Sequence, residues 1–223
     1  CMWIDSYFLP PPEDTAQELF ESGMDAMGEK EYGDAQEYFT KLKDRFPFSP
    51  YTPQAELALG DAYFLDEDYP AAVEAYREFE ALHPRHEQAP YVLYQLGVSL
   101  YRKFFSVDRP QQDIREAMQY FFRLQEAYPE TEYAEKSKEF IGKCRRLLAE
   151  HEVYVADFYW DRNLYGAAWK RYTLVTEQYP DLEDVYAYAK ERSKASYLLY
   201  QEQRAQADLD REEGSWKDWF DWL

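Results

Sequence analysis

Five side chains have the chemistry for nucleophilic attack or metal binding, namely Cys1, Cys144, His83, His86 and His151. None of the histidines lies at zinc-site spacing from cysteine or acidic ligands, and the pair around Pro84 is expected to be solvated. The sequence contains no glycine-rich phosphate loop and no Gly-x-Ser-x-Gly nucleophile turn. Carboxylates are too numerous, at 44, for any pair to indicate catalysis. We therefore expect no enzymatic activity, no metal site and no cofactor.

Cys1 has the most specific chemistry of the five. An N-terminal cysteine is typical of bacterial proteins that lose a signal peptide and carry lipid on that cysteine, with the several acyl chains that stable anchoring needs. The triplet Pro10-Pro11-Pro12 favours an extended chain, so residues 1–13 are predicted to form a lipidated tether. Met2, in place of aspartate, is compatible with delivery to the outer membrane. The alternative is that Cys1 is only where this polypeptide starts. Cys144 is expected to be a small core residue.

The composition excludes several classes of partner. The chain has 223 residues, 44 acidic and 25 basic, and a formal net charge of −19. Such a chain repels nucleic acid and anionic membrane surfaces. No apolar run approaches the roughly 20 residues that span a bilayer. The acidity is interpreted as a solvated face, with attraction of a basic partner as the alternative.

The elements that position these residues follow from a repeated pattern. A small residue is followed twelve positions later by alanine, then by an aromatic residue and a proline, and the third copy has eight extra residues after its glycine. Small residues let antiparallel helices touch, aromatic rings fill the space between them, and proline ends each copy. This is the tetratricopeptide (TPR) pattern, whose period is roughly 34 residues and whose arrays usually bind proteins or peptides. The four copies are Gly23, Ala35, Phe39, Pro47; Gly60, Ala72, Tyr76, Pro84; Gly97, Ala117, Phe121, Pro129; and Ala156, Ala168, Tyr172, Pro180.

The register predicts an all-α, right-handed TPR superhelical solenoid of about five antiparallel helix pairs. Asp14 is the predicted N-cap of the first helix. Residues 14–130 are expected to form three repeats, and residues 131–213 two more, the fifth pair spanning 182–210. The predicted helices cover 14–28, 31–45, 52–66, 69–82, 87–101, 111–127, 132–161 and 165–178.

The segment 214–223 has a different composition. Trp216, Trp219, Phe220 and Leu223 are spaced as one stripe of an amphipathic turn or helix. We expect the stripe to cap the end of the array. A docking peptide and an interfacial anchor are the alternatives.

Four stretches and Cys1 resemble the BamD (YfiO) family of outer-membrane assembly lipoproteins. They span most of residues 1 to about 200 in the family's order, and the insertion among them is absent from generic TPR proteins. Segment 214–223 departs from the family pattern. The stretches are Arg45-Phe46-Pro47-Phe48-Ser49-Pro50-Tyr51, residues 89–97, the insertion at 104–109, and residues 148–159 with Tyr179-Pro180-Asp181 after them.

The resemblance implies a periplasm-facing lipoprotein of the bacterial outer membrane, held there by its N-terminal lipid only. Its implied role is as a scaffold subunit of the machinery that inserts β-barrel proteins, beside other assembly lipoproteins. The C-terminal repeats would bind the POTRA domains of the barrel-forming BamA subunit. The N-terminal repeats would receive unfolded outer-membrane proteins, including their aromatic C-terminal signal. The alternative function is a periplasmic TPR lipoprotein adaptor that organises the cell envelope or peptidoglycan enzymes.

Candidate binding residues follow from the TPR register, in which positions of each first helix face a concave groove. An aromatic and methionine-lined trough with a cation at one edge suits an extended apolar segment ending in a carboxylate. The alternative is that several of these residues pack against adjacent repeats. The predicted substrate-binding residues are Phe20, Met24, Met27, Phe64, Tyr91, Tyr94, Tyr101 and Arg102, with Leu57 and Asp61 at equivalent positions.

Cations beside the fourth repeat are the candidates for partner binding in this acidic chain. Arg171 lies where the family has a basic residue, and arginine pairs with carboxylates in bidentate fashion. The alternative is a solvent-exposed charge. The predicted partner-binding residues are Arg162, Lys170 and Arg171, with Phe105, Asp108 and Arg109 of the insertion.

Overall fold

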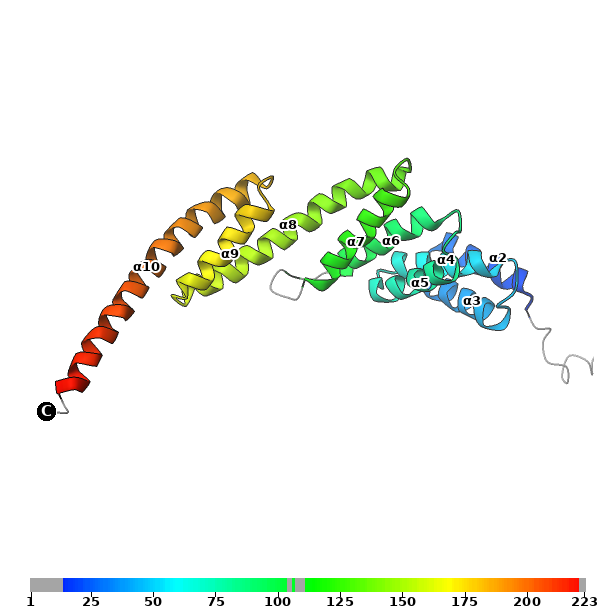
Figure 1. Cartoon of the computed structure of the whole chain (residues 1–223). Helices are drawn as coiled ribbons and strands as arrows, with labels where there is room; N and C mark the ends of the chain where they lie inside the picture. Colours follow the sequence, from blue (N-terminus) through cyan, green and yellow to red (C-terminus); the bar gives the residue numbers. More distant parts are fainter. Residues whose placement is uncertain (1–13, 104–105, 107–110, 221–223) are drawn as a thin grey trace, which may run out of the picture. The chain divides into compact units, whose positions relative to one another are not determined.

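The structure, a computed structural model, describes residues 14–103, 106 and 111–220, with side chains described as far as Glu212. Within these ranges every regular element is an α-helix (Figure 1). The helices are α2 (Ala16–Glu29), α3 (Tyr32–Arg45), α4 (Thr52–Leu65), α5 (Tyr69–Leu82), α6 (Ala89–Lys103), α7 (Gln112–Ala127), α8 (Glu132–Asp161), α9 (Tyr165–Gln178) and α10 (Glu183–Phe220).

The helices follow one another as hairpins, as the repeat register predicts. Consecutive pairs are α2 and α3, α4 and α5, α6 and α7, and α8 and α9. The expected all-α repeat architecture is therefore confirmed, and most predicted helix ends lie within two residues of the observed ones.

Close contact between a glycine and an aromatic ring holds each of the first three hairpins together. A Cβ atom added to Gly23 would lie 2.5 Å from Phe39, and one added to Gly60 would lie 2.6 Å from Tyr76. Both rings are completely buried. Gly97 and Phe121 repeat the arrangement. At the small-residue positions of the pattern, the aromatic ring of the second helix of a hairpin therefore packs against the backbone of the first helix.

The start of α2 differs from the prediction. Thr15, not Asp14, is the N-cap, because its side chain accepts a hydrogen bond from the backbone N–H of Glu18 at 3.2 Å. The Glu18 carboxylate accepts in return from the backbone N–H of Thr15 at 2.8 Å. This reciprocal capping box satisfies two backbone donors that a helix start leaves without partners.

The expected fifth helix pair is a single helix, α10. Residues 182–213 contain neither glycine nor proline, so nothing in the sequence turns the chain there. Gly214 does not interrupt the helix either, because an isolated glycine weakens a helix by only about 1 kcal/mol. Residues 214–220 therefore continue α10, and the capping role expected of the stripe stays a prediction. The side chains of that stripe, and Leu223 altogether, lie outside the described residues.

The chain divides into two compact units. Unit 1 comprises Cys1–Phe104 and Arg115–Phe140, and unit 2 comprises Phe105–Ile114 and Ile141–Leu223. Among the described residues, the boundaries between the units fall within α7 and within α8. The predicted division of the chain after residue 130 and the assignment of functions to the two halves stay predictions.

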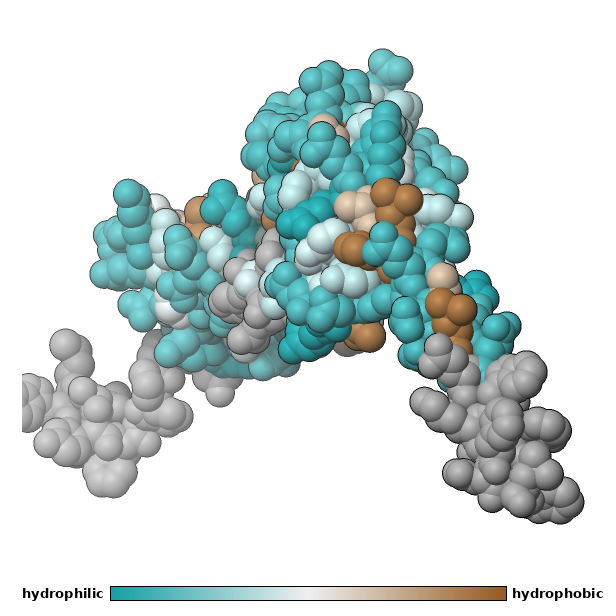
Figure 2. All heavy atoms as spheres, turned by 90° about the vertical axis from the view of Figure 1, so that its left-hand side faces the viewer, coloured by the Kyte–Doolittle hydropathy of each residue, from teal (hydrophilic) through white to brown (hydrophobic). Residues whose placement is uncertain are grey.

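Hydrophilic residues dominate the face shown in Figure 2, where hydrophobic residues form small separate patches. Across the described part of the chain, no helix has the length and apolar character needed to cross a membrane. Cys144 is fully buried, as expected for a core residue.

Candidate functional site

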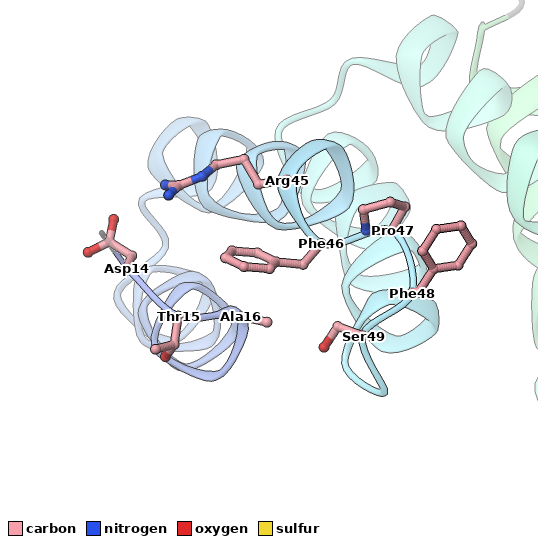
Figure 3. Close-up of a pocket in the computed structure, with 8 residues that line it drawn as sticks. All are labelled: Asp14, Thr15, Ala16, Arg45, Phe46, Pro47, Phe48 and Ser49. Atoms are coloured by element: carbon pink, nitrogen blue, oxygen red, sulfur yellow. The ribbon is translucent and has the colours of Figure 1, made fainter. Parts of the chain in front are cut away.

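A pocket of about 570 Å³ opens at the N-terminal end of unit 1 (Figure 3). One wall is the start of α2, and the other is the end of α3 with the turn that follows it. The capping box of Thr15 and Glu18 fixes the first wall. The second is fixed by the Thr52 hydroxyl, which donates to the carbonyl of Phe46 at 2.6 Å. The lining residues are Asp14, Thr15, Ala16, Arg45, Phe46, Pro47, Phe48 and Ser49.

The two phenylalanines of this turn have opposite roles. Phe46 packs against the core of the first repeats, and the guanidinium of Arg45 lies 5.5 Å from its ring. Phe48 is 98% exposed, and Figure 3 shows it pointing away from Phe46. Prolines on both sides keep this short turn out of a helix. The pocket thus offers an apolar surface, an exposed ring and a cation to a ligand.

The predicted trough residues of α2 and α4 are only partly open. The Phe20 ring lies 5.5 Å from Tyr51 and 6.2 Å from Phe39. Phe64 lies 5.7 Å from Tyr69, and Met27 packs half-buried against the core. Met24 is 46% exposed. Leu57 is half-buried as well.

The predicted residues of α6 are covered by the first part of α8. Tyr91 and Tyr94 contact Tyr133, with ring centroids 5.5 and 5.7 Å apart, and Tyr101 lies 5.4 Å from Phe140. Tyr94 also lies 5.9 Å from Phe140, and the three tyrosines are half-buried. The structure therefore brings these tyrosines together in an aromatic cluster that packs adjacent repeats. Arg102 is exposed.

Asp61 lies at the centre of a hydrogen-bond cluster that joins three helices. Its Oδ1 atom accepts from the hydroxyls of Tyr76 and Tyr91, each at 2.6 Å. Gln95 donates to the Tyr91 hydroxyl at 3.0 Å. Burial raises the pKa of the Asp61 carboxyl, and the two tyrosine hydrogen bonds oppose that rise. Asp61 thus fixes α4 against α5 and α6 and is not a free ligand-binding carboxylate.

Unit 2 contains a second copy of this cluster. Oδ1 of Asp157 accepts from Tyr172 and, at 2.8 Å, from Tyr188. Two positions of the repeat pattern vary together along the chain: the residue that directly follows the small residue, and the aromatic residue of the same copy. Where that residue is aspartate the ring is tyrosine, and where it is apolar the ring is phenylalanine. The pairs are Met24 with Phe39, Asp61 with Tyr76, Val98 with Phe121, and Asp157 with Tyr172.

The three predicted cations of unit 2 have different surroundings. The guanidinium of Arg162 lies 3.5 Å from the centre of the Phe158 ring. Arg171 donates to the buried carboxylate of Glu152 at 2.6 Å, so it already serves the packing of α8 against α9. Lys170 is exposed.

The histidine pair differs from its prediction. His83 and Glu56 share a hydrogen bond of 2.6 Å, and the Glu56 side chain is only 8% exposed. The rings of His83 and His86 both lie against Phe79, at 4.9 and 5.2 Å. The pair is therefore partly buried rather than solvated, because the turn folds back onto α5. No group of three metal-binding side chains occurs among the described residues.

Four predicted residues, Cys1, Phe105, Asp108 and Arg109, lie outside the described residues. Sequence reasoning missed Phe48, Tyr133 and Phe140 as parts of these surfaces. The exposure of Phe48 could have been predicted, since the prolines on both sides prevent a helix that would place its ring in the core. Tyr133 and Phe140 have the spacing i, i+7 of one helix face, which could have placed them against α6.

Repeated helix hairpins with a small residue packed against an aromatic ring define a helical-repeat protein of the tetratricopeptide type. Among solved structures, the chain is similar to the TPR2AB domain of yeast Sti1 in complex with pHSP90, with a TM-score of 0.50 and 12% identity. The match covers 83% of this chain and 70% of the other. Similarity at that identity supports the fold alone.

The family follows from the sequence itself. Residues 12–210 match the model of the YfiO family, described as outer membrane lipoprotein, and the chain belongs to this family. It is 29% identical over 182 residues to the outer membrane protein assembly factor BamD of Vibrio cholerae, covering 77% of this chain and 76% of the relative. It is 28% identical over 197 residues to the BamD of Neisseria meningitidis serogroup A, covering 84% and 72%. The resemblance read from the sequence is confirmed.

Proposed function

We propose that this protein is an outer-membrane protein assembly factor, a periplasm-facing lipoprotein subunit of the machinery that inserts β-barrel proteins. The family match over residues 12–210 carries the proposal, since the family is described as outer membrane lipoprotein and the related proteins are named outer membrane protein assembly factors. The repeat architecture supports it, because arrays of this kind bind proteins. Lipid on Cys1 would hold the protein at the membrane.

The N-terminal pocket is our candidate for the substrate-receiving site. An unfolded barrel protein presents an extended apolar segment that ends in an aromatic residue and a carboxylate. Phe48 would stack on the aromatic residue, and Arg45 would attract the carboxylate. The predicted trough residues Met24 and Arg102, both exposed, extend the list of contacts to be tested.

Unit 2 is our candidate for the contact with the POTRA domains of the barrel-forming subunit. Lys170 is the cleanest probe of this contact, because it is exposed and no packing interaction depends on it in the described part of the chain. Arg171 is a poorer probe, because its removal leaves the buried Glu152 carboxylate without its cation. A loss of binding in an Arg171 variant would therefore need a test of folding beside it.

The decisive experiment combines depletion with co-purification. We expect depletion to lower the amount of barrel proteins in the outer membrane, and the detergent-solubilised protein to co-purify stoichiometrically with its POTRA-domain partner. Unchanged barrel levels together with co-purification of peptidoglycan enzymes would refute the proposal in favour of an envelope adaptor. The intact mass of the N-terminal peptide from native membranes tests lipidation, and an unmodified thiol there would exclude the anchor.

The substrate site has its own test. A peptide ending in phenylalanine with a free carboxylate should bind more tightly than its amidated form. Phe48→Ala should weaken that binding, whereas Phe122→Ala, at a residue of α7 that is 48% exposed, should not. Equal binding by the two variants would remove the pocket from the proposal.

A further inference from the structure

The N-terminal pocket lies where the described part of the chain begins (Figure 3). Asp14, Thr15 and Ala16 line one wall, and residues 1–13, which lie outside the described residues, directly precede them. An extended chain covers about 3.3–3.6 Å per residue, so residues 3–12 can span up to about 35 Å. A pocket of about 570 Å³ is far narrower than that length. The segment is therefore long enough to reach the opposite wall.

Residues 3–12 have the composition of an apolar ligand. The first seven of them are mostly aromatic or aliphatic, namely Trp3, Ile4, Tyr7, Phe8 and Leu9. Burial of such side chains is favourable roughly in proportion to the apolar area that it removes from water. The proline triplet that follows favours the extended polyproline conformation, which docks in aromatic-lined grooves because little entropy remains to be lost.

The opposite wall of the pocket presents an ordered aromatic surface to such a segment. The Phe48 side chain is 98% exposed, so almost all of its area is open to a ligand. Backbone hydrogen bonds hold the turn that carries it: the N–H of Ser49 donates to the carbonyl of Phe46 at 3.0 Å, and the N–H of Thr52 donates to the carbonyl of Ser49 at 3.1 Å. A surface that is already ordered loses little conformational entropy when a ligand binds.

Covalent attachment favours this segment over a ligand from solution. A segment joined to its site by a short linker has an effective concentration on the order of 1 mM at that site. With a Kd of about 0.1 mM, it would occupy the pocket roughly nine-tenths of the time and weaken a competing ligand about tenfold. The net charge of −19 disfavours the same segment of a second copy, because the two chains repel each other.

We propose that residues 3–12 dock in the N-terminal pocket of their own chain, with their aromatic side chains against Phe46 and Phe48, and compete there with segments of similar chemistry. The rings of residues 3–9 and the carboxylate of Asp5 match the apolar, aromatic and acidic groups of the ligand proposed for this pocket. The inference deepens the proposed function by adding an internal competitor. It rests on that function only for the identity of the ligand that the segment excludes.

Photo-crosslinking in the full chain tests the docking itself. With p-benzoylphenylalanine in place of Phe48, we expect a crosslink at monomer mass that mass spectrometry locates within residues 1–13. The same crosslinker in place of Phe122, which is 48% exposed on α7, should not give it. A triple variant with Trp3→Ser, Tyr7→Ser and Phe8→Ser should lower the yield at least fivefold. An unchanged yield would overturn the proposal, because the segment would then merely be near, and so would a crosslink between two chains.

Fluorescence anisotropy tests the competition, with a labelled peptide that ends in phenylalanine and a free carboxylate. We expect the triple variant to bind this peptide at least fivefold more tightly than the native chain does, and Ser6→Ala, the control in the same segment, to leave binding unchanged. Equal binding by the native chain and the triple variant would overturn the proposal. A crosslink within the chain, without binding of the peptide to either protein, would support docking and refute the peptide as a ligand. Failure of the proposed substrate site is therefore distinguishable from failure of this inference.

Discussion

Replacing Tyr76 with phenylalanine tests whether the aspartate clusters hold neighbouring helices together. The change removes a fully buried hydroxyl that donates to Asp61 at 2.6 Å and leaves the ring against Gly60 unchanged. A hydrogen bond to a charged group contributes about 1.5–3 kcal/mol. We therefore expect Tyr76→Phe to lower the free energy of unfolding of unit 1 by about 2 kcal/mol.

Native-state hydrogen exchange is the appropriate assay, because two compact units need not unfold together. The expected loss corresponds to roughly 30-fold faster exchange of the most protected amides of α4 and α5. Amides of α9 and α10 should be unaffected. Tyr172→Phe should give the opposite pattern, since Tyr172 bonds to Asp157 in unit 2. Tyr69→Phe is the control, because no hydrogen bond of its hydroxyl is found among the described residues and only its ring contacts Phe64.

The same cluster predicts a pH dependence. Burial raises the pKa of Asp61 in the folded state, so the folded protein binds a proton more readily than the unfolded chain does. The buried, charged Asp61 carboxylate lowers the free energy of unfolding, and this destabilising effect should shrink as the pH falls and the carboxylate binds a proton. The stability of the native protein relative to Asp61→Asn should rise on acidification from pH 7. Exchange rates in Tyr76→Phe that match the native protein, or a stability difference that stays constant with pH, would refute the reasoning.

Three further predictions follow from single contacts. Gly60→Ala places a Cβ 2.6 Å from the Tyr76 ring and should lower the free energy of unfolding by about 1–3 kcal/mol, seen as a lower Tm. Ala156→Gly should lower it by no more than about 1 kcal/mol. Equal losses in the two variants would contradict the close packing of Gly60 against Tyr76. Hydrogen bonds from the Thr15 backbone and side chain lower the pKa of Glu18. The capping box should therefore stabilise the protein at pH values above the ordinary glutamate pKa and lose this effect as the pH falls. An NMR titration should show that the pKa of Glu18 rises in Thr15→Ala. Burial raises the pKa of Cys144 to about 12, so its thiol should resist alkylation at pH 8 until the protein is unfolded. Rapid labelling of the native protein would contradict the burial of this thiol.

The helices were predictable because each depends on local residues. Gly23 and Phe39, for example, lie 16 positions apart in a pattern that recurs, and proline ends each copy. The exception was the region after residue 182, where the expected pair required a turn that no residue there provides. A repeat register predicts where helices pack, but only breaking residues decide where they end.

The binding surfaces were less predictable, because a repeat register cannot show which rings a later helix covers. Tyr91 and Tyr94 have groove positions in the pattern, yet Tyr133 of α8 packs on both. Arg171 looked like a free cation, but its partner Glu152 lies 19 positions away, at a spacing that no sequence pattern links to it. Charge and burial depend on such distant contacts, which only the structure contains.

The unbroken course of α10 has a consequence for changes in chain length. Among the described residues, the last hydrogen bond from α10 to the preceding hairpin runs from Gln203 to the carbonyl of Asn163 at 2.9 Å. Beyond it the helix continues for about 25 Å, at 1.5 Å per residue, to Phe220. Deleting one residue in this stretch would rotate everything after it by about 100°, whereas deleting seven would return it almost to its original bearing. The direction in which the last turns of α10 face is therefore set by the number of residues before them as much as by their identity.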